Sequence, residues 1–323
     1  MNHITNNSTV KFLSRIATSD FYFENETDVT QIGLYYDGNT NLYFLFISPS
    51  SLNLFMIRFN INEAKWYLNK LEKFTQKSDR YQAVAAFSNQ DKIIWYILTD
   101  ELKIKLEIFH KDFKVEINRY TGNHLYRRST LFLIDGLPCS IGGGDDKQKS
   151  FTYQDSYYAD NFIQYARENP FVCKLLDHLY LLGGNLDNAN LVEHIKLPNY
   201  HSVDKNTSSS YNRDWEKVQY YSERSTFDSS FDLKLNVLTD TACVVKTKIN
   251  LFRPDSFVNN YFYSYDVLTN TWANRRIVSN IANLPLKEEK VSFKAINIGD
   301  HIYIASFDKL NDEGLKISLF NLL

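Results

Sequence analysis

Short apolar runs of strand length, separated by polar turns, recur along the whole chain. The clearest set begins at residues 80–87, resumes at 92–98 after a polar turn and adds a third run at 103–110. Apolar or alternating runs of about four to eight residues, bounded by turn residues, are typical of β-strands. Tyr and Phe are abundant and fit the pleated surface of a sheet. The pattern therefore predicts an all-β chain.

A large aromatic residue recurs about every fifty residues, in step with these sets of strands. It stands at Trp66, Phe113, Phe162, Trp215 and Trp272. A recurrence of this length indicates a repeat architecture, in which each unit must stack on its neighbours to bury its apolar face. The same order of four strands fits units at about 30–74, 80–120, 128–170, 171–225 and 231–283.

The last unit, 291–323, contains only three predicted strands. An extended segment at 9–16 precedes the first unit and has no partner inside it. Pairing this segment with the C-terminal strand would complete the last unit and remove the exposed edges of the ring. The sequence thus predicts one domain over 1–323, a six-bladed β-propeller of four-stranded antiparallel blades. A pair of β-sandwiches would leave both the period and the orphan strands unexplained.

Several short motifs resemble kelch repeats. The double glycines within 140–144 and 178–184 resemble the end of the second kelch strand, and 265–272 resembles the end of the third strand with its turn. Arg80, followed by two alanines, resembles the start of a first strand. The resemblance covers the whole chain in rhythm but only some units in motif, since four units lack the double glycine. It implies a diverged kelch-type propeller, with glycines at positive φ and tryptophans packed between sheets.

Composition and charge exclude several classes of partner. The 36 basic and 38 acidic residues are interspersed and give a net charge of -2, so we expect no nucleic acid and no membrane partner. No apolar run is long enough for a membrane helix, and residues 1–9 lack a secretory signal pattern. We expect a soluble, cytoplasmic protein, although secretion as an effector by a signal-less route stays open.

No catalytic, metal or cofactor motif stands out. The seven histidines lack metal-ligand spacing, and no Gly-x-Ser-x-Gly motif is present. Cys139, Cys173 and Cys243 have no close-spaced pair, so we expect buried thiols in a reducing compartment rather than disulfides or a zinc site. We predict no cofactor and no metal, and whether the protein is an enzyme stays open.

The predicted binding surface is one face of the disc, where the second-to-third-strand loops, one of them expected at 249–260, and the connections between units converge. Its arginines could meet carboxylates, and its aspartates could meet basic groups. The candidate residues are Arg80, Arg127, Arg128, Arg224, Arg253, Asp145, Asp146, Asp187 and Asp255. A polar insertion at 198–214 is expected on the opposite face.

Two functions fit this surface. The first is a non-enzymatic module that presents the loop face to a protein or peptide partner, as kelch-like propellers often do. The alternative is a sugar-binding protein or a sialic acid mutarotase-like enzyme that takes an acidic sugar, because some six-bladed kelch-type proteins are such mutarotases. Neither oligomeric state nor partner identity follows from the sequence.

Overall fold

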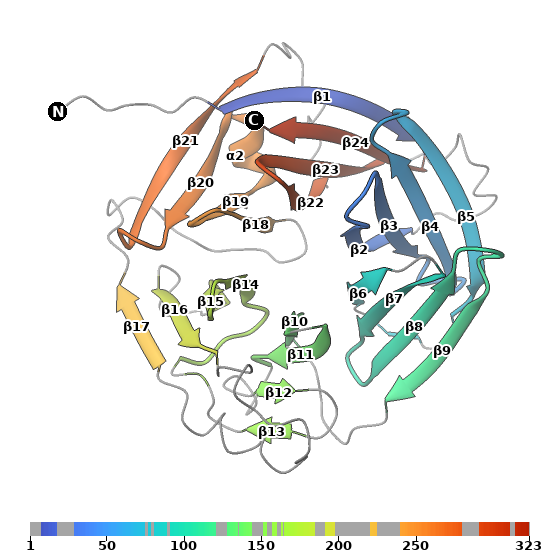
Figure 1. The fold of residues 1–323 in the computed structure, drawn as a ribbon, viewed down its shortest axis with the longest axis horizontal. Helices are drawn as coiled ribbons and strands as arrows, with labels where there is room; N and C mark the ends of the chain where they lie inside the picture. The colour runs from blue at the N-terminus through green and yellow to red at the C-terminus, as the bar shows by residue number, and fades with distance from the viewer. Residues whose placement is uncertain are drawn as a thin grey trace.

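The computed structural model consists almost entirely of antiparallel β-sheets arranged around a centre (Figure 1). It describes residues 8–17, 29–74, 77–78, 81–88, 91–120, 128–134, 136–143, 151–153, 157–159, 163, 165–184, 191–197, 220–224, 240–279, 291–310 and 314–322. The predicted insertion at 198–214 lies outside these residues.

The described residues form four four-stranded sheets and one eight-stranded sheet, and each four-stranded sheet follows the chain order. The first sheet contains β2 (Thr30–Tyr36), β3 (Asn41–Ile47), β4 (Asn53–Asn60) and β5 (Lys65–Lys73). The second contains β6 (Gln82–Ser88), β7 (Lys92–Leu98), β8 (Lys103–Phe109) and β9 (Val115–Tyr120). The third contains β10 (Thr130–Ile134), β11 (Leu137–Ile141), β12 (Phe151–Tyr153) and β13 (Tyr157–Ala159). The fourth contains β14 (Phe171–Leu175), β15 (His178–Leu182), β16 (Leu191–Lys196) and β17 (Tyr220–Arg224).

The eight-stranded sheet joins two further sets of four strands edge to edge. The first set is β18 (Thr241–Val245), β19 (Lys248–Phe252), β20 (Tyr261–Asp266) and β21 (Thr271–Ser279). The second set is β22 (Val291–Ile298), β23 (His301–Leu310), β24 (Gly314–Leu322) and the N-terminal β1 (Ser8–Ala17). We call these sets the fifth and sixth units.

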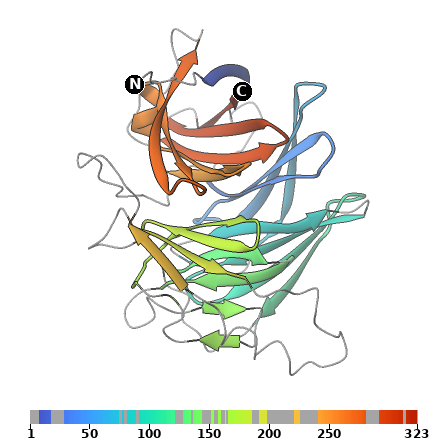
Figure 2. The same ribbon diagram turned by 60° about the vertical axis from the view of Figure 1, so that its left-hand side comes forward.

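The N-terminal strand joins the two units. It pairs antiparallel with β24, from Val10 opposite Leu322 to Ala17 opposite Lys316, as the sequence predicted. Its first three residues also pair in parallel with residues 277–279 of β21. Figure 2 shows β1, in dark blue, next to the red C-terminal strand. The sequence did not predict the parallel pairing, which merges two units into one sheet.

The first strands of the six sets contact one another in cyclic order around the centre. The contacts join β2 to β6, β6 to β10, β10 to β14, β14 to β18, β18 to β22 and β22 to β2. In the described part of the chain, these first strands lie toward the centre of the molecule (Figure 1).

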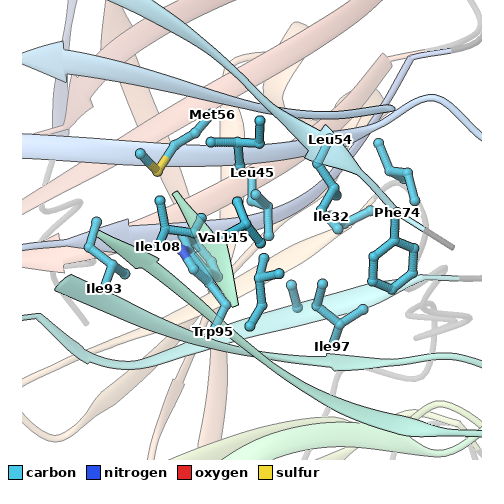
Figure 3. Packing of buried hydrophobic residues seen from close by; sticks show 14 of the residues in the cluster. Ile32, Leu45, Leu54, Met56, Phe74, Ile93, Trp95, Ile97, Ile108 and Val115 are labelled. Atoms are coloured by element: carbon cyan, nitrogen blue, oxygen red, sulfur yellow. The ribbon is translucent and has the colours of Figure 1, made fainter. Parts of the chain in front are cut away.

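The cores lie between neighbouring sheets. Between the first and second sheets, Leu45, Met56, Trp95 and Ile108 pack together with no exposed surface (Figure 3). A glycine makes room for the indole, since a Cβ on Gly33 would lie 2.4 Å from Cζ3 of Trp95. The sheets thus hold together through the apolar surface that faces between them.

The recurring tryptophans lie in these cores, as predicted, where the structure describes them. Trp66 packs on Phe59 with ring centroids 4.6 Å apart, and Trp272 packs on Tyr265 at 5.1 Å. All three cysteines are buried, and none of them forms a disulfide within the described chain. Burial raises the pKa of the Cys173 thiol to about 12, so this thiol stays protonated and acts as a small apolar residue.

Both double glycines allow a connecting segment to pass close to the strand ends. Gly142 and Gly184 have φ of +75° and +70°, and an added Cβ would lie 2.6 Å from the carbonyl oxygens of Arg167 and Glu168, respectively. Arg167 itself is fully buried, and its Nε donates to Oε2 of Glu193 at 3.1 Å. The glycines therefore have the structural role that the sequence predicted.

One predicted loop differs in the structure. Residues 249–260 were expected to form a second-to-third-strand loop, but β19 extends through Phe252 and a one-turn helix, α2 (Pro254–Val258), follows. Pro254 at the first helical position favours this start because its ring fixes a helical φ and it has no N–H to satisfy.

Candidate functional site

The predicted loop-face residues are only partly within the described chain. The structure places Arg128, Arg253 and Asp255, and it gives the backbone of Arg224 at the end of β17. The other candidates lie outside the described residues. They are Arg80, Arg127, Asp145, Asp146 and Asp187.

Two of the predicted residues meet in one cluster at the β19–α2 connection. Nε of Arg253 lies 3.6 Å from Oδ2 of Asp240 and 3.6 Å from Oδ1 of Asp255. Asp240 is only 3% exposed and directly precedes β18. One guanidinium and two carboxylates give this cluster a net charge of -1. It is therefore a poor site for an acidic ligand.

Beside this cluster, the hydroxyl of Tyr263 donates to that of Tyr261 at 3.5 Å. Burial raises the pKa of Tyr263 to about 12. The hydroxyl stays protonated at neutral pH, so it supplies a hydrogen-bond donor and not a base.

Arg128 does not join the cluster around Arg253. Its Nη1 donates to Oε2 of Glu168 at 2.8 Å, and the arginine side chain is 61% exposed. An exposed ion pair of this kind contributes about 1 kcal/mol or less to stability. Both described arginine side chains of the predicted face are thus engaged by carboxylates of the same chain.

A pocket lies at the other ends of the strands, between the fifth and sixth units. Its volume is about 280 Å³. The fifth unit contributes the turn between β18 and β19 and side chains of β19, β20 and β21. The sixth unit contributes Asp300, Ile302 and Leu322, and Ser8 of β1 completes the lining.

The sequence of the fifth unit explains why the pocket is present. Across its four strands, Cys243 pairs with Asn250, Asn250 with Ser264, and Ser264 with Ala273. Side chains at such paired positions share one face of the sheet. The neighbouring row holds Phe252 and Phe262, which fill the space between units. The row of small and polar residues beside these phenylalanines does not fill the space between the units, and this unfilled space is the pocket.

Buried polar groups line this pocket. Ser264 is 3% exposed, and its Oγ has no hydrogen-bond partner among the residues that the structure describes. Asn250 is 6% exposed in the paired position on the next strand. A buried hydroxyl without a partner costs about 1–3 kcal/mol, which a ligand that hydrogen-bonds to it would recover.

The charges around the pocket are predominantly positive. Lys246, Lys248 and Arg275 face one carboxylate, Asp300, so three positive charges and one negative charge give +2. Nζ of Lys246 lies 3.1 Å from Oδ1 of Asp300, and both side chains are largely exposed. Within the described chain, no carboxylate forms an ion pair with Lys248 or Arg275. Ile302 and Leu322 form an apolar wall opposite these groups.

Neither a metal centre nor a membrane helix emerges from the described residues. Among them, no group of three or more His, Cys, Asp or Glu side chains is placed to hold a metal ion. None of the helices in the described chain is long and apolar enough to cross a membrane.

The arrangement of sheets around a centre is that of a β-propeller, and the similarity to one solved structure, that of YjhT, supports this class. The structure of YjhT is similar with a TM-score of 0.53 at 10% identity, over 91% of this chain and 95% of that one. Hsv2 with its loop 6CD replaced by a Gly-Ser linker has a TM-score of 0.45 at 8% identity, covering 90% and 98%. A GH43_1 enzyme from Xanthomonas citri has a TM-score of 0.43 at 10% identity, over 91% of this chain and 87% of that one.

No protein-family model matches the chain, and no curated protein matches it either. At identities this low, the similarity to YjhT shows the fold alone. The chain is a β-propeller, and its function has to be argued from its own residues.

Sequence reasoning missed the pocket. Its polar side chains, including Asn250 and Ser264, interrupt strands whose other inward positions are apolar. That interruption was the available signal, but only the strand pairing shows that the two residues are neighbours.

Proposed function

We propose that this β-propeller binds a small acidic ligand of the sugar class in the pocket between its fifth and sixth units. The observation that carries the proposal is the lining, which combines a net positive charge, a buried hydroxyl without a partner and an apolar wall. Cations attract a carboxylate, polar side chains hydrogen-bond to hydroxyl groups, and the apolar wall accepts the face of a sugar ring.

The size of the pocket supports a ligand of one sugar ring. Its volume of about 280 Å³ lies near the lower end of the range for small-molecule sites, roughly 300–1,000 Å³. A folded protein partner would not enter such a space.

Binding without catalysis is the proposed activity. Among the described residues, the lining contains no histidine and no glutamate, and its one carboxylate, Asp300, is paired with Lys246 at the rim. Opening and closing a sugar ring, as a mutarotase does, needs a proton donor and acceptor beside the ring oxygen. These residues offer no such pair.

The proposal takes the chain as a closed, six-bladed propeller of diverged kelch type. The cyclic contacts of the first strands and the pairing of β1 with β24 support six blades. The double glycines at positive φ support the kelch assignment. A solution structure with other than six blades would contradict it.

A second candidate function is protein or peptide binding through the loop face. The exposure of Arg128 and Asp255 favours it, since their side chains are 61% and 64% accessible. A partner would have to compete with the carboxylates that already pair with Arg128 and Arg253. We therefore place this function second.

Calorimetric titration with N-acetylneuraminate, D-glucuronate and D-glucose tests the proposed function. We expect the two acids to bind more tightly than glucose, and Arg275→Gln to weaken acid binding at least tenfold, since about 1.4 kcal/mol is lost with a charge-assisted contact. Arg276→Gln is the matched control, because Arg276 is exposed and alternates to the other face of β21. The proposal fails if none of the sugars binds or if both variants bind alike.

A further inference from the structure

The pocket lies at the seam that β1 closes. Ser8, the first residue of β1, is part of the lining. Arg275 on β21 and Leu322 on β24 also line it, and these are the two strands between which β1 lies. All three strands that make the seam therefore contribute to one pocket.

The two pairings of β1 are unequal. Seven residue pairs connect β1 to β24, but only three connect it to β21. Short pairings at the end of a strand open more readily than long ones. The weaker link of the seam is thus the parallel contact between residues 8–10 and 277–279.

The same side chains support the weak pairing and the pocket wall. Val10 and Ile277 are each 2% exposed in the core between the two units, and Leu322 of the pocket lining belongs to that core. Leu322 is also the residue that pairs with Val10. If β1 separated from β21, Ser8 would leave the lining, and the core that contains Val10 and Ile277 would be disturbed.

We infer that ligand binding in this pocket and the pairing of β1 with β21 stabilise each other, so that the ligand closes the seam between the fifth and sixth units. The inference rests on the proposed function. A ligand that touches both walls binds the closed seam more tightly than the open one, and this difference shifts the equilibrium toward closure. By thermodynamic reciprocity, any change that opens the seam lowers the affinity for the ligand.

Hydrogen exchange measures how the ligand affects the pairing of β1 with β21. Amides of residues 8–10 and 277–279 are followed with and without saturating N-acetylneuraminate, and the neutral N-acetylmannosamine serves as the control. We expect the acid to slow exchange at these amides about tenfold, within the usual range of coupling between sites. Amides of β6–β9 in the second sheet should change far less, which separates seam closure from a general gain in stability.

A variant of β1 measures how the pairing of β1 with β21 affects the affinity for the ligand. Thr9 is exposed, pairs with Val278 and is not part of the lining, so Thr9→Pro disturbs the parallel pairing without removing a ligand contact. We expect affinity for N-acetylneuraminate to fall about tenfold in Thr9→Pro and to stay unchanged in the control Thr9→Val. The exchange experiment on the unaltered protein stands on its own if Thr9→Pro does not fold.

The outcomes separate the coupling from the proposed function. If N-acetylneuraminate binds and Arg275→Gln weakens it, but neither seam exchange nor the Thr9→Pro affinity changes, the coupling is wrong and the binding site stands. If N-acetylneuraminate does not bind at all, both proposals are overturned. Slower exchange at the seam together with weaker binding in Thr9→Pro supports both.

Discussion

The space between neighbouring sheets of this β-propeller determines which side-chain size fits at individual positions. Gly33 on β2 faces the indole of Trp95 on β7, and no larger residue fits beside that ring. Ser264 is the opposite case, since its small side chain leaves space that nothing in the described chain fills. One small residue completes a core, whereas the other opens a pocket.

Gly33→Ala should lower the free energy of unfolding by about 1–3 kcal/mol, because the new methyl group would lie 2.4 Å from Cζ3 of Trp95 and 3.1 Å from Cβ of Ala83. Urea unfolding followed by tryptophan fluorescence or circular dichroism measures the change. The same substitution in a Trp95→Phe background should cost less, since the smaller ring leaves room. Equal costs in the two backgrounds would show that the indole is not the cause.

At the scale of the element, the link between the third and fourth sheets depends on a buried ion pair. Arg167 lies before β14 and Glu193 lies on β16, and both side chains are fully buried. Nη1 of Arg167 also donates to the carbonyl oxygen of Gly183. Burial lowers the pKa of Arg167, and the nearby Glu193 partly offsets this by favouring the charged form.

Glu193→Gln should destabilise the protein by about 3–5 kcal/mol, because it leaves a buried guanidinium without its counter-charge. Chemical unfolding at neutral pH gives this value. The double variant Arg167→Met with Glu193→Gln should lose less than the sum of the single variants, since it removes both charges. Strict additivity would mean that the two side chains do not stabilise each other.

Strands and local motifs could be predicted from the sequence better than the site. The run predicted at 92–98 matches β7, and the double glycines have the positive φ expected of them. These features depend on residues close together in the chain. The pocket could not be predicted, because Asn250 and Ser264 become neighbours only through strand pairing, and Ser8 joins them from the other end of the chain.

At the scale of the whole molecule, β1 determines whether two sheet edges are covered. It pairs with β24 on one side and β21 on the other, and Phe12 packs edge-on against Phe320 with centroids 5.8 Å apart. Without β1, both strands would present unpaired backbone groups, and exposed edges of this kind promote association.

A variant that lacks residues 1–17 should therefore have a lower melting temperature and should self-associate. Light scattering coupled to size-exclusion chromatography measures the association, and circular dichroism measures the melting. A synthetic peptide of residues 1–17 should restore a monomer, whereas a scrambled peptide should not. A truncated protein that remains monomeric with an unchanged melting temperature would contradict this role of β1.

The pairing of Val10 with Leu322 also affects how the protein is made. A ribosome that adds roughly 5–20 residues per second needs roughly 15–60 s between these two positions. During that time the N-terminal strand has no partner from the C-terminal strand, while the units between them can already fold. β1 and β24 can pair only after this interval, and a chaperone that shields β1 until then would raise the yield of folded protein.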